Sequence, residues 1–231
     1  MGLGTLLERL GGQLALACLC AALCGTAMAK DPMPPVSPEG MRLQQSKDAR
    51  ILYRREGADL GKYQQVKILD PYIAFEKNWQ RDYNRTAMGM QQRVRDEDME
   101  RMKKDLSSEF RRVFETELLK EGGYALADEV APDVLVLRPA IIDLVVNAPD
   151  LRMANARTIV RSAGGMTLYL ELWDSAPEQI VARIIDRQDD DGFAQVATRA
   201  SNKAAATDIL EDWAKKLRSH LDAARASAPA P

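Results

Sequence analysis

Residues 134–146 read VLVLRPAIIDLVV and form a strongly apolar stretch in the middle of the chain. Apolar side chains occupy odd and even positions alike, whereas a strand with one wet face alternates apolar and polar residues. The pattern predicts a central strand covered on both faces, or a strand that changes face partway along. Either way, we expect a β-sheet assembled around this stretch.

Three further segments predict strands around it. Residues 166–173 (MTLYLELW) alternate strictly, which predicts one face in the core and one face partly exposed to water. After a turn, residues 180–186 (IVARIID) are expected to pair back as a hairpin. Residues 63–75 (YQQVKILDPYIAF) predict one more strand, interrupted or bulged at Pro71 because proline cannot donate to a ladder.

Two long helices complete the predicted fold. The first opens on acidic residues from Asp96, which favour the positive end of the helix dipole, and ends at Gly122-Gly123. The second covers about residues 201–223, while residues 80–95 lack periodicity and predict a loop. The expected fold class is α+β, a mainly antiparallel or mixed sheet of four to five strands with two long helices packed on one face.

The first twenty-nine residues have the features of a signal peptide. Residues 14–25 (LALACLCAALCG) form an apolar run too short to span a bilayer with ease, and the small side chains of Ala27 and Ala29 fit signal peptidase. Cleavage is expected after Ala29, the alternative being an uncleaved amphipathic anchor. Lipidation of Cys18 or Cys24 is a further alternative, but neither cysteine has a convincing lipobox, since Leu23 stands where a small residue is expected.

These features predict both location and domain boundaries. We expect export to the periplasm or cell envelope of a Gram-negative bacterium, with a soluble domain favoured over a lipid-anchored one and membrane contact only through lipidation or an uncleaved leader. After a signal peptide at 1–29, residues 30–50 predict a proline-rich spacer, residues 51–223 a single α+β domain, and residues 224–231 a disordered tail.

The composition leaves little material for catalysis. The 32 Lys and Arg residues nearly balance 34 Asp and Glu, which argues against a polybasic nucleic-acid binder. All three cysteines lie in the leader, and the single histidine, His220, is expected at a helix end, where a cation favours the dipole. The acidic residues 186 and 189–191 do not match calcium-loop spacing. No nucleophile elbow, phosphate loop or zinc-protease motif is present, so we expect no enzyme activity, metal or cofactor.

A few side chains remain as interaction candidates. Asp143 sits inside an apolar run, where a lone buried carboxylate is costly, so it is expected to be paired with Arg138 or Arg183 or to lie at a bulge. Trp173 is flanked by Glu171 and Asp174, as in some sugar sites, although a regular strand directs these two carboxylates to opposite faces. The only local basic cluster comprises four residues, Arg81, Arg85, Arg93 and Arg95.

Diffuse positions along the chain also resemble a known family. They are Tyr63, Val66 and Ile68 in the first strand, then Leu172-Trp173-Asp174-Ser175, Glu178, Ile180 and Arg183 in the hairpin, and Trp213-Ala214 and Leu217 in the last helix. From about Leu52 to Leu221 the chain resembles the bacterial domain of unknown function 3313 family. The resemblance implies an exported or lipoprotein-like protein and no established activity. The chain departs from the family pattern at Ala176-Pro177, where the hairpin turn favours Thr-Gly, and in its poor lipobox.

Two functional hypotheses follow. The first is a non-catalytic module that binds an unknown envelope protein or component through its sheet face or its arginine cluster. The second is a small extracytoplasmic hydrolase or ligand binder that uses carboxylates such as Asp143, Glu171 or Asp174. The second hypothesis requires these oxygens to converge in one pocket with raised carboxyl pKa values.

Overall fold

The computed structural model describes residues 33–86, 93–147, 149, 158–160, 164–176, 178–190, 195–197 and 199–227. The predicted signal peptide, both candidate lipidation sites and Asp191 lie outside these residues. In chain order the elements are β1 (Arg42–Gln44), β2 (Ile51–Arg54), β3 (Gln65–Ile68), β4 (Tyr72–Phe75), α1 (Trp79–Thr86), α2 (Asp96–Leu118), β5 (Ala125–Leu126), β6 (Val134–Val146), β7 (Thr158–Val160), β8 (Gly164–Asp174), β9 (Gln179–Asp189), β10 (Gln195–Ala197) and α3 (Arg199–Ser227).

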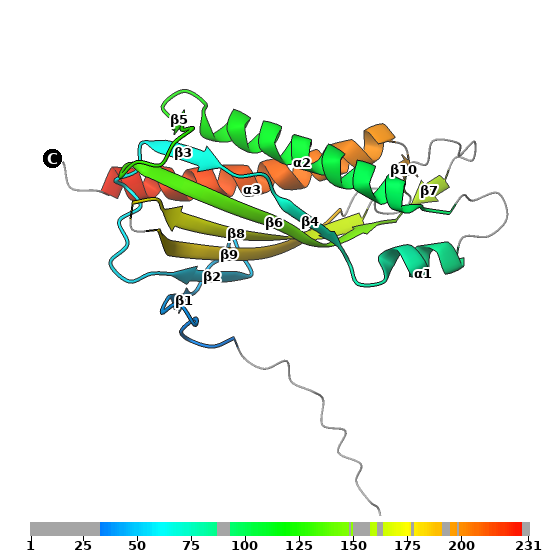
Figure 1. Ribbon diagram of the computed structural model, residues 1–231, viewed down its shortest axis with the longest axis horizontal. Helices are drawn as coiled ribbons and strands as arrows, with labels where there is room; N and C mark the ends of the chain where they lie inside the picture. The colour runs from blue at the N-terminus through cyan, green and yellow to red at the C-terminus, as the bar shows by residue number, and fades with distance from the viewer. Residues whose placement is uncertain are drawn as a thin grey trace, which may run out of the picture. The chain divides into compact units, whose positions relative to one another are not determined.

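A mixed sheet of eight strands forms the centre of the fold (Figure 1). Its main path runs β1-β2-β9-β8-β6-β3-β5, and β4 pairs with β6 beside β3. Strands β3 and β4 run parallel to β6, whereas β8 runs antiparallel to it. The expectation of four to five strands and two helices was therefore wrong, although the α+β class holds. The short strands have two to four residues, which is too few for an alternating pattern to be visible in the sequence.

The predicted strand at 63–75 is in fact two strands that share one neighbour. β3 pairs with residues 134–137 of β6 and β4 with residues 140–144, so the Asp70-Pro71 break lies between two separate ladders. Pro139 of β6 lies opposite this gap, where its missing amide donor removes no bond from either parallel ladder. This arrangement explains how a proline remains inside a central strand.

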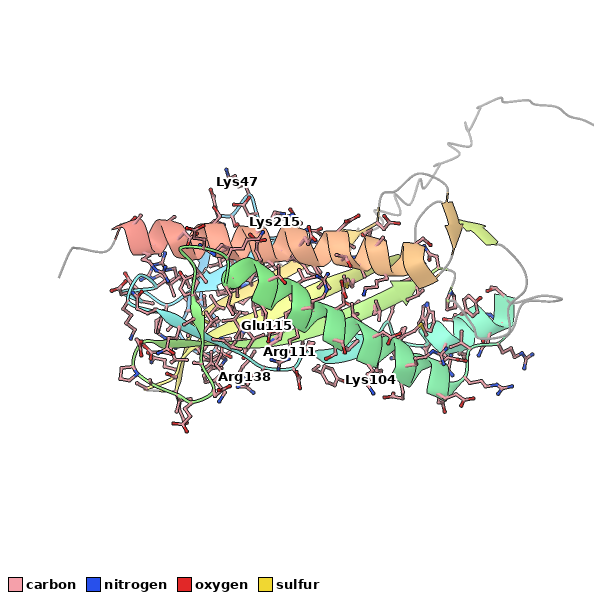
Figure 2. All side chains as sticks on the ribbon, turned by 90° about the horizontal axis from the view of Figure 1, so that it is seen from above. Lys47, Lys104, Arg111, Glu115, Arg138 and Lys215 are labelled. Carbon is pink, nitrogen blue, oxygen red and sulfur yellow. The ribbon has the colours of Figure 1, made fainter. Side chains whose placement is uncertain are left out.

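Helices α2 and α3 lie side by side over one face of the sheet (Figures 1 and 2). Phe110 and Phe114 of α2 stack at 4.0 Å between ring centroids and pack with Leu137 of β6 in the main core. From α3, Leu210 and Trp213 enter the same cluster. The helix expected from Asp96 is confirmed, and Asp98 accepts a hydrogen bond from the backbone N–H of Arg95 at its start (3.0 Å).

The third helix, α1, replaces part of the loop expected at residues 80–95. Its first residue, Trp79, stacks on Phe75 at 4.5 Å and on Tyr83 at 5.8 Å. The helix has only eight residues, and its buried side is formed by this aromatic stack and not by a repeated apolar stripe. Helical periodicity was therefore absent from the sequence.

The segment expected as a spacer contributes to the folded unit from residue 34 onward. β1 pairs with β2, and the Tyr53 hydroxyl donates to the backbone oxygen of Pro34 (2.8 Å). Met41 is fully buried against Tyr53 and Ile180. At the other end, α3 continues to Ser227, so residues 224–227 of the expected tail are helical. No helix in the described ranges combines the length and the apolar character needed to cross a membrane.

Candidate functional site

The side chains of most functional interest lie on the sheet face turned away from α2 and α3. Alternation along β8 sends its leucines into the helix-covered core and sends Tyr169, Glu171 and Trp173 the other way. Cross-strand pairing aligns Arg138 of β6 and Arg183 of β9 with Glu171. We call this the open face and define it by six residues, Tyr72, Arg138, Tyr169, Glu171, Trp173 and Arg183.

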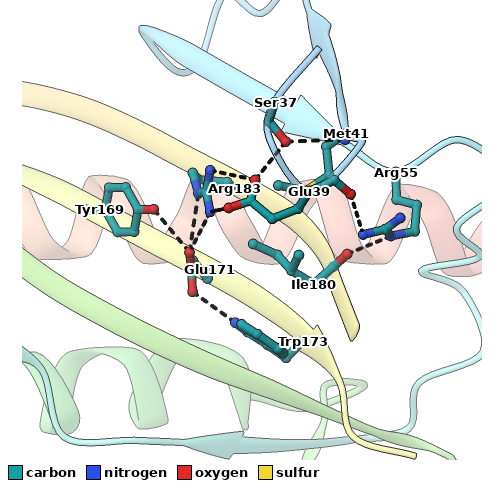
Figure 3. A network of polar contacts seen from close by, with 9 residues as sticks. All are labelled: Ser37, Glu39, Met41, Arg55, Tyr169, Glu171, Trp173, Ile180 and Arg183. Atoms are coloured by element: carbon teal, nitrogen blue, oxygen red, sulfur yellow. Dashed lines mark hydrogen bonds and ion pairs between the residues drawn. The ribbon is translucent and has the colours of Figure 1, made fainter. Parts of the chain in front are cut away.

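Glu171 is the centre of a polar network on the open face (Figure 3). One of its oxygens accepts from the Tyr169 hydroxyl (3.0 Å) and from Nη2 of Arg183 (2.9 Å), and the other accepts from Nε1 of Trp173 (3.0 Å). The side chains of Glu171 and Arg183 are only 14% and 13% exposed. The network therefore holds two aromatic rings and one guanidinium in fixed positions.

The N-terminal segment joins this network through Glu39. Arg183 holds both carboxylate oxygens of Glu39 (2.8 and 3.2 Å), and the Ser37 hydroxyl donates to the same carboxylate (2.8 Å). Arg55 donates to the backbone oxygens of Glu39 (2.9 Å) and Ile180 (2.8 Å). Figure 3 shows the segment crossing beside β9, so these bonds fasten it to the edge of the open face.

The network keeps its carboxylates ionised. Hydrogen bonds from Arg183 and Ser37 lower the pKa of Glu39 to about 2. Burial would raise the pKa of Glu171, but hydrogen bonds from Arg183 and the two aromatic side chains outweigh burial and lower it. Burial, helped by the hydrogen bond to Glu171, raises the pKa of Tyr169 to about 12. These directions suit a structural ion pair and oppose a proton-donating carboxylic acid.

Beside the network, the open face presents an arginine stacked on an aromatic ring. The guanidinium carbon of Arg138 lies 4.9 Å from the centroid of the Trp173 ring. Arg138 is exposed and makes no ion pair with any residue in the described part of the chain. Tyr72 of β4 lies opposite Ala140 in the next row of the same face and is 68% exposed. Strands β4 and β6 thus place the exposed side chains of Tyr72 and Arg138 close together on the open face.

The structure does not unite the predicted arginine cluster with this face. Arg81 and Arg85 are exposed on α1 and share Asp82 as an ionic partner (3.0 and 3.5 Å). Arg95 lies at the start of α2 and pairs with Glu97 (3.4 Å), and Arg93 is exposed just before it. Much of the cluster's positive charge is balanced locally.

The three candidate carboxylates do not converge. Asp143 is exposed at an irregularity between β6 and β8 with a φ of +50°, so the bulge alternative was correct and no bond joins its side chain to Arg138 or Arg183. Asp174 pairs with Lys62 (2.5 Å), and hydrogen bonds from that lysine and from Tyr63 overcome burial to lower its pKa. Neither carboxylate joins the Glu171 network.

The remaining sequence candidates have local partners. His220 lies on α3 with Nε2 at 3.0 Å from Asp48. Asp186 accepts from Nε1 of Trp213 (2.9 Å), and Asp189 pairs with Arg187 (2.7 Å). Among the described residues, no three histidine, cysteine or acidic side chains are grouped to hold a metal ion.

Sequence reasoning missed Glu39 and Tyr72 as residues of this surface. Glu39 stands in a proline-rich stretch that predicted a spacer, and it meets Arg183 across 144 positions of sequence. Tyr72 follows Pro71 in a stretch that was expected to be one interrupted strand and is in fact two, β3 and β4. The alternation of residues 166–173 was a usable signal, since it correctly placed Tyr169, Glu171 and Trp173 on one face.

A Glu39→Gln substitution should reveal the contribution of this carboxylate through its pH dependence. Since the pKa of Glu39 falls from 4.5 to about 2 on folding, its stabilisation is present above pH 4.5 and is lost as the pH falls toward 2. Because Glu39 is partly exposed, the variant should lose only about 1 kcal/mol or less of unfolding free energy at pH 7. Urea unfolding between pH 7 and pH 3 should give a flatter pH profile for the variant than for the unmodified chain. Glu56→Gln is the matched control, because Glu56 is 76% exposed in its pair with Arg42; an equal flattening there would contradict the assignment.

The comparisons with known proteins give a family and several distant structures. The model of a family described as "Protein of unknown function (DUF3313)" matches residues 37–217. Comparison with curated proteins returns no match. Similar solved structures include protein XCC0632 from Xanthomonas campestris, with 17% identity over 73% of this chain and 90% of that one at a TM-score of 0.41. A putative neuraminyllactose-binding hemagglutinin homolog from Helicobacter pylori shows 15% identity over 75% and 94% at 0.41. The PelC dodecamer from Paraburkholderia phytofirmans shows 12% identity over 70% and 94% at 0.33.

Proposed function

The chain belongs to the DUF3313 family of proteins of unknown function, and from its open face we propose that it is a non-catalytic, exported module that binds a protein of the cell envelope. The observation that carries this proposal is the exposed Arg138 stacked on Trp173, with Tyr72 beside it. The helices leave this face uncovered (Figure 1).

The residue types on the open face favour a protein partner. Tryptophan, tyrosine and arginine are enriched among the few interface residues that supply most of the binding energy. Here Trp173 is held by Glu171 and Arg138 by the ring of Trp173, so both lose little conformational freedom on binding. The surface is therefore organised before a partner arrives.

The charge of the surface suggests what the partner presents. Glu171 is already neutralised by Arg183, whereas Arg138 stacks on the Trp173 ring and forms no ion pair with a carboxylate of the described residues. An acidic side chain on the partner would gain a charge-assisted hydrogen bond from Arg138 without displacing an internal ion pair. We therefore propose a partner with an acidic residue next to an apolar patch.

The hydrolase alternative has less support. It required Asp143, Glu171 and Asp174 to share a pocket and to have raised carboxyl pKa values. The three carboxylates are separate, and the pKa values of Glu171 and Asp174 are lowered. None of the three lines either of two cavities formed by described residues, one of about 500 Å³ beside α3 and one of about 650 Å³ between α2 and α3. A binding role fits this arrangement better than acid–base chemistry.

Site-specific photocross-linking in intact cells would test the proposal. With a benzoylphenylalanine at position 72, we expect one defined adduct, because Tyr72 is exposed on the open face. The same adduct should decline at least fivefold when Arg138→Glu is added, since the reversed charge repels an acidic partner.

The matched control places the same cross-linker at Lys104, an exposed residue of α2 on the helix-covered side (Figure 2). The same adduct from both positions would contradict the assignment of the open face. Recovery of the monomer alone, while a known envelope pair is captured in the same cells, would contradict the binding role itself.

A further inference from the structure

A row of mainly apolar side chains crosses the open face from strand to strand. The pairing registers align one residue from each of five strands, in the order Ile51 (β2), Ile185 (β9), Tyr169 (β8), Ala140 (β6) and Tyr72 (β4). Directly opposed residues have their side chains on the same face of a sheet, so all five share the face of Tyr169. We call these five residues the cross-strand row.

The cross-strand row is accessible to a partner. Tyr72 is 68% exposed, and the other four side chains are partly exposed. The N-terminal segment borders the β2 end of the row, where Met41 packs against Ile51. At about 4.8 Å per strand, the four intervals from β2 to β4 give the row a length of roughly 19 Å. A continuous, largely apolar surface of this length is a candidate contact site.

Polar side chains on both sides limit the width of this surface. On one side lie Arg183, Glu171 and Arg138, and on the other lie Arg187, Thr167 and Ile142. Successive rows on one face are two residues apart along a strand, which is about 7 Å. The apolar surface is therefore long and narrow, and its long axis crosses the strands.

An α-helix matches the spacing of the cross-strand row. A helix rises 5.4 Å per turn and neighbouring strands are about 4.8 Å apart, so a helix inclined by about 27° to the row presents one turn to each strand. Roughly fourteen residues would cover the row, with an apolar residue every three or four positions, as in an amphipathic helix. An extended peptide presents same-face side chains about 6.7 Å apart, which does not match the strand spacing.

The charges beside the row specify one border of such a helix. Arg183 and Arg187 already have carboxylate partners within the chain. Arg138 forms no ion pair with a carboxylate of the described residues and lies two positions from Ala140 in β6. An acidic residue at the edge of the apolar stripe would reach Arg138 from the turn over Ala140. A helix laid along the strands would instead cover the polar side chain of Glu171.

We propose that the cross-strand row docks an amphipathic α-helix of the partner protein, which lies across the strands with its apolar stripe on the row and an acidic residue beside Arg138. This inference rests on the proposed binding function and specifies which part of the partner is bound. Helices α2 and α3 cover the other face of the sheet (Figure 1), so the docked helix would complete a three-layer arrangement.

Cross-linkers spaced along the row test this geometry. Benzoylphenylalanine is placed at position 72, 140 or 185, one at a time, in intact cells, and mass spectrometry identifies the partner residue in each adduct. Positions 72 and 185 are three strand intervals apart, roughly 14 Å. We expect all three adducts within one partner segment, with the partner position shifting by about ten residues from 72 to 185. An extended segment would shift by only about four residues.

A charge in the middle of the row provides a second measurement. Ala140→Lys should lower the yield of the position-72 adduct at least fivefold, because it places an ammonium group under the apolar stripe. Ala204→Lys is the matched control, since it makes the same change at an exposed position of α3, and it should alter the yield less than 1.5-fold. Thermal unfolding of both variants checks that they fold.

The outcomes separate this inference from the binding function. A shift of about four residues, or adducts in separate segments of the partner, would overturn the docked helix and leave the binding proposal intact. Adducts to lipid would identify another occupant and overturn the helix as well. An unchanged adduct in Ala140→Lys would remove the row from the interface. No adduct at any of the three positions would overturn the binding proposal and this inference with it.

Discussion

Gly164→Ala is expected to lower the free energy of unfolding by about 4 kcal/mol, because it combines backbone strain with a steric clash. Gly164 has a φ of +140°, a region that side-chain-bearing residues rarely adopt. An added Cβ would lie 1.9 Å from the backbone oxygen of Val145. Neither backbone can move freely, since Gly164 pairs with Val146 where β8 joins β6.

Urea unfolding followed by circular dichroism measures this loss. The matched control is Gly57→Ala, where φ is also positive (+74°) but nothing lies within 4 Å of the added Cβ. Strain alone should cost this control about 1–2 kcal/mol. If both variants lost the same stability, the close approach of β6 to Gly164 would not be the cause.

Glu171→Leu should have the second largest effect, a loss of about 3 kcal/mol at neutral pH. The substitution leaves the largely buried guanidinium of Arg183 with Glu39 as its remaining carboxylate partner, and it leaves the Tyr169 hydroxyl and the Trp173 indole without their acceptor. Leucine is similar in size, so the loss reports the missing acceptor and not a cavity.

A double variant, Glu171→Leu with Arg183→Met, separates these causes. The double variant also loses the bonds from Arg183 to Glu39, but it removes both partners of the Glu171–Arg183 pair, so its loss of unfolding free energy should be smaller than the sum of the two single losses by about 1 kcal/mol. Chemical denaturation at pH 7 measures all three variants. Losses that simply add would show that Glu171 does not act by compensating Arg183.

These variants also bear on the binding proposal. Glu171 acts on the open face through Trp173, whose ring in turn supports Arg138. Glu171→Leu should therefore reduce the cross-link at position 72 even at temperatures where the chain remains folded.

The sequence was most informative where a pattern repeats within one element. Strict alternation placed the leucines of β8 in the core and Tyr169, Glu171 and Trp173 on the opposite face. The hairpin of β8 and β9 and the two long helices were likewise predicted from local periodicity. Residues 134–146 form a central strand as expected, but not one covered on both faces, since Arg138 is exposed on the open face. An irregularity beside Asp143 interrupts the pairing of this strand with β8.

The sequence could not show which distant segments become neighbours. The amino-acid pattern of residues 63–75 is equally compatible with one interrupted strand and with two strands parallel to β6, because alternation does not encode the pairing direction. The same limit hid the bond between Glu39 and Arg183, and it hid the cavity beside α3, whose walls come from three strands, loops and a helix.

By itself, the sequence determined the α+β class, the main helices, the inward and outward faces of β8 and a resemblance to the family to which the chain belongs. These properties follow from side-chain periodicity, which is local and therefore readable along the chain. Only the tertiary structure decided that the sheet is mixed and eight-stranded, that Glu171 is an ion-paired centre and that a cavity lies beside α3. Each of these depends on strand pairing and burial between residues far apart in sequence, where the stabilising contact exists only after the chain has folded.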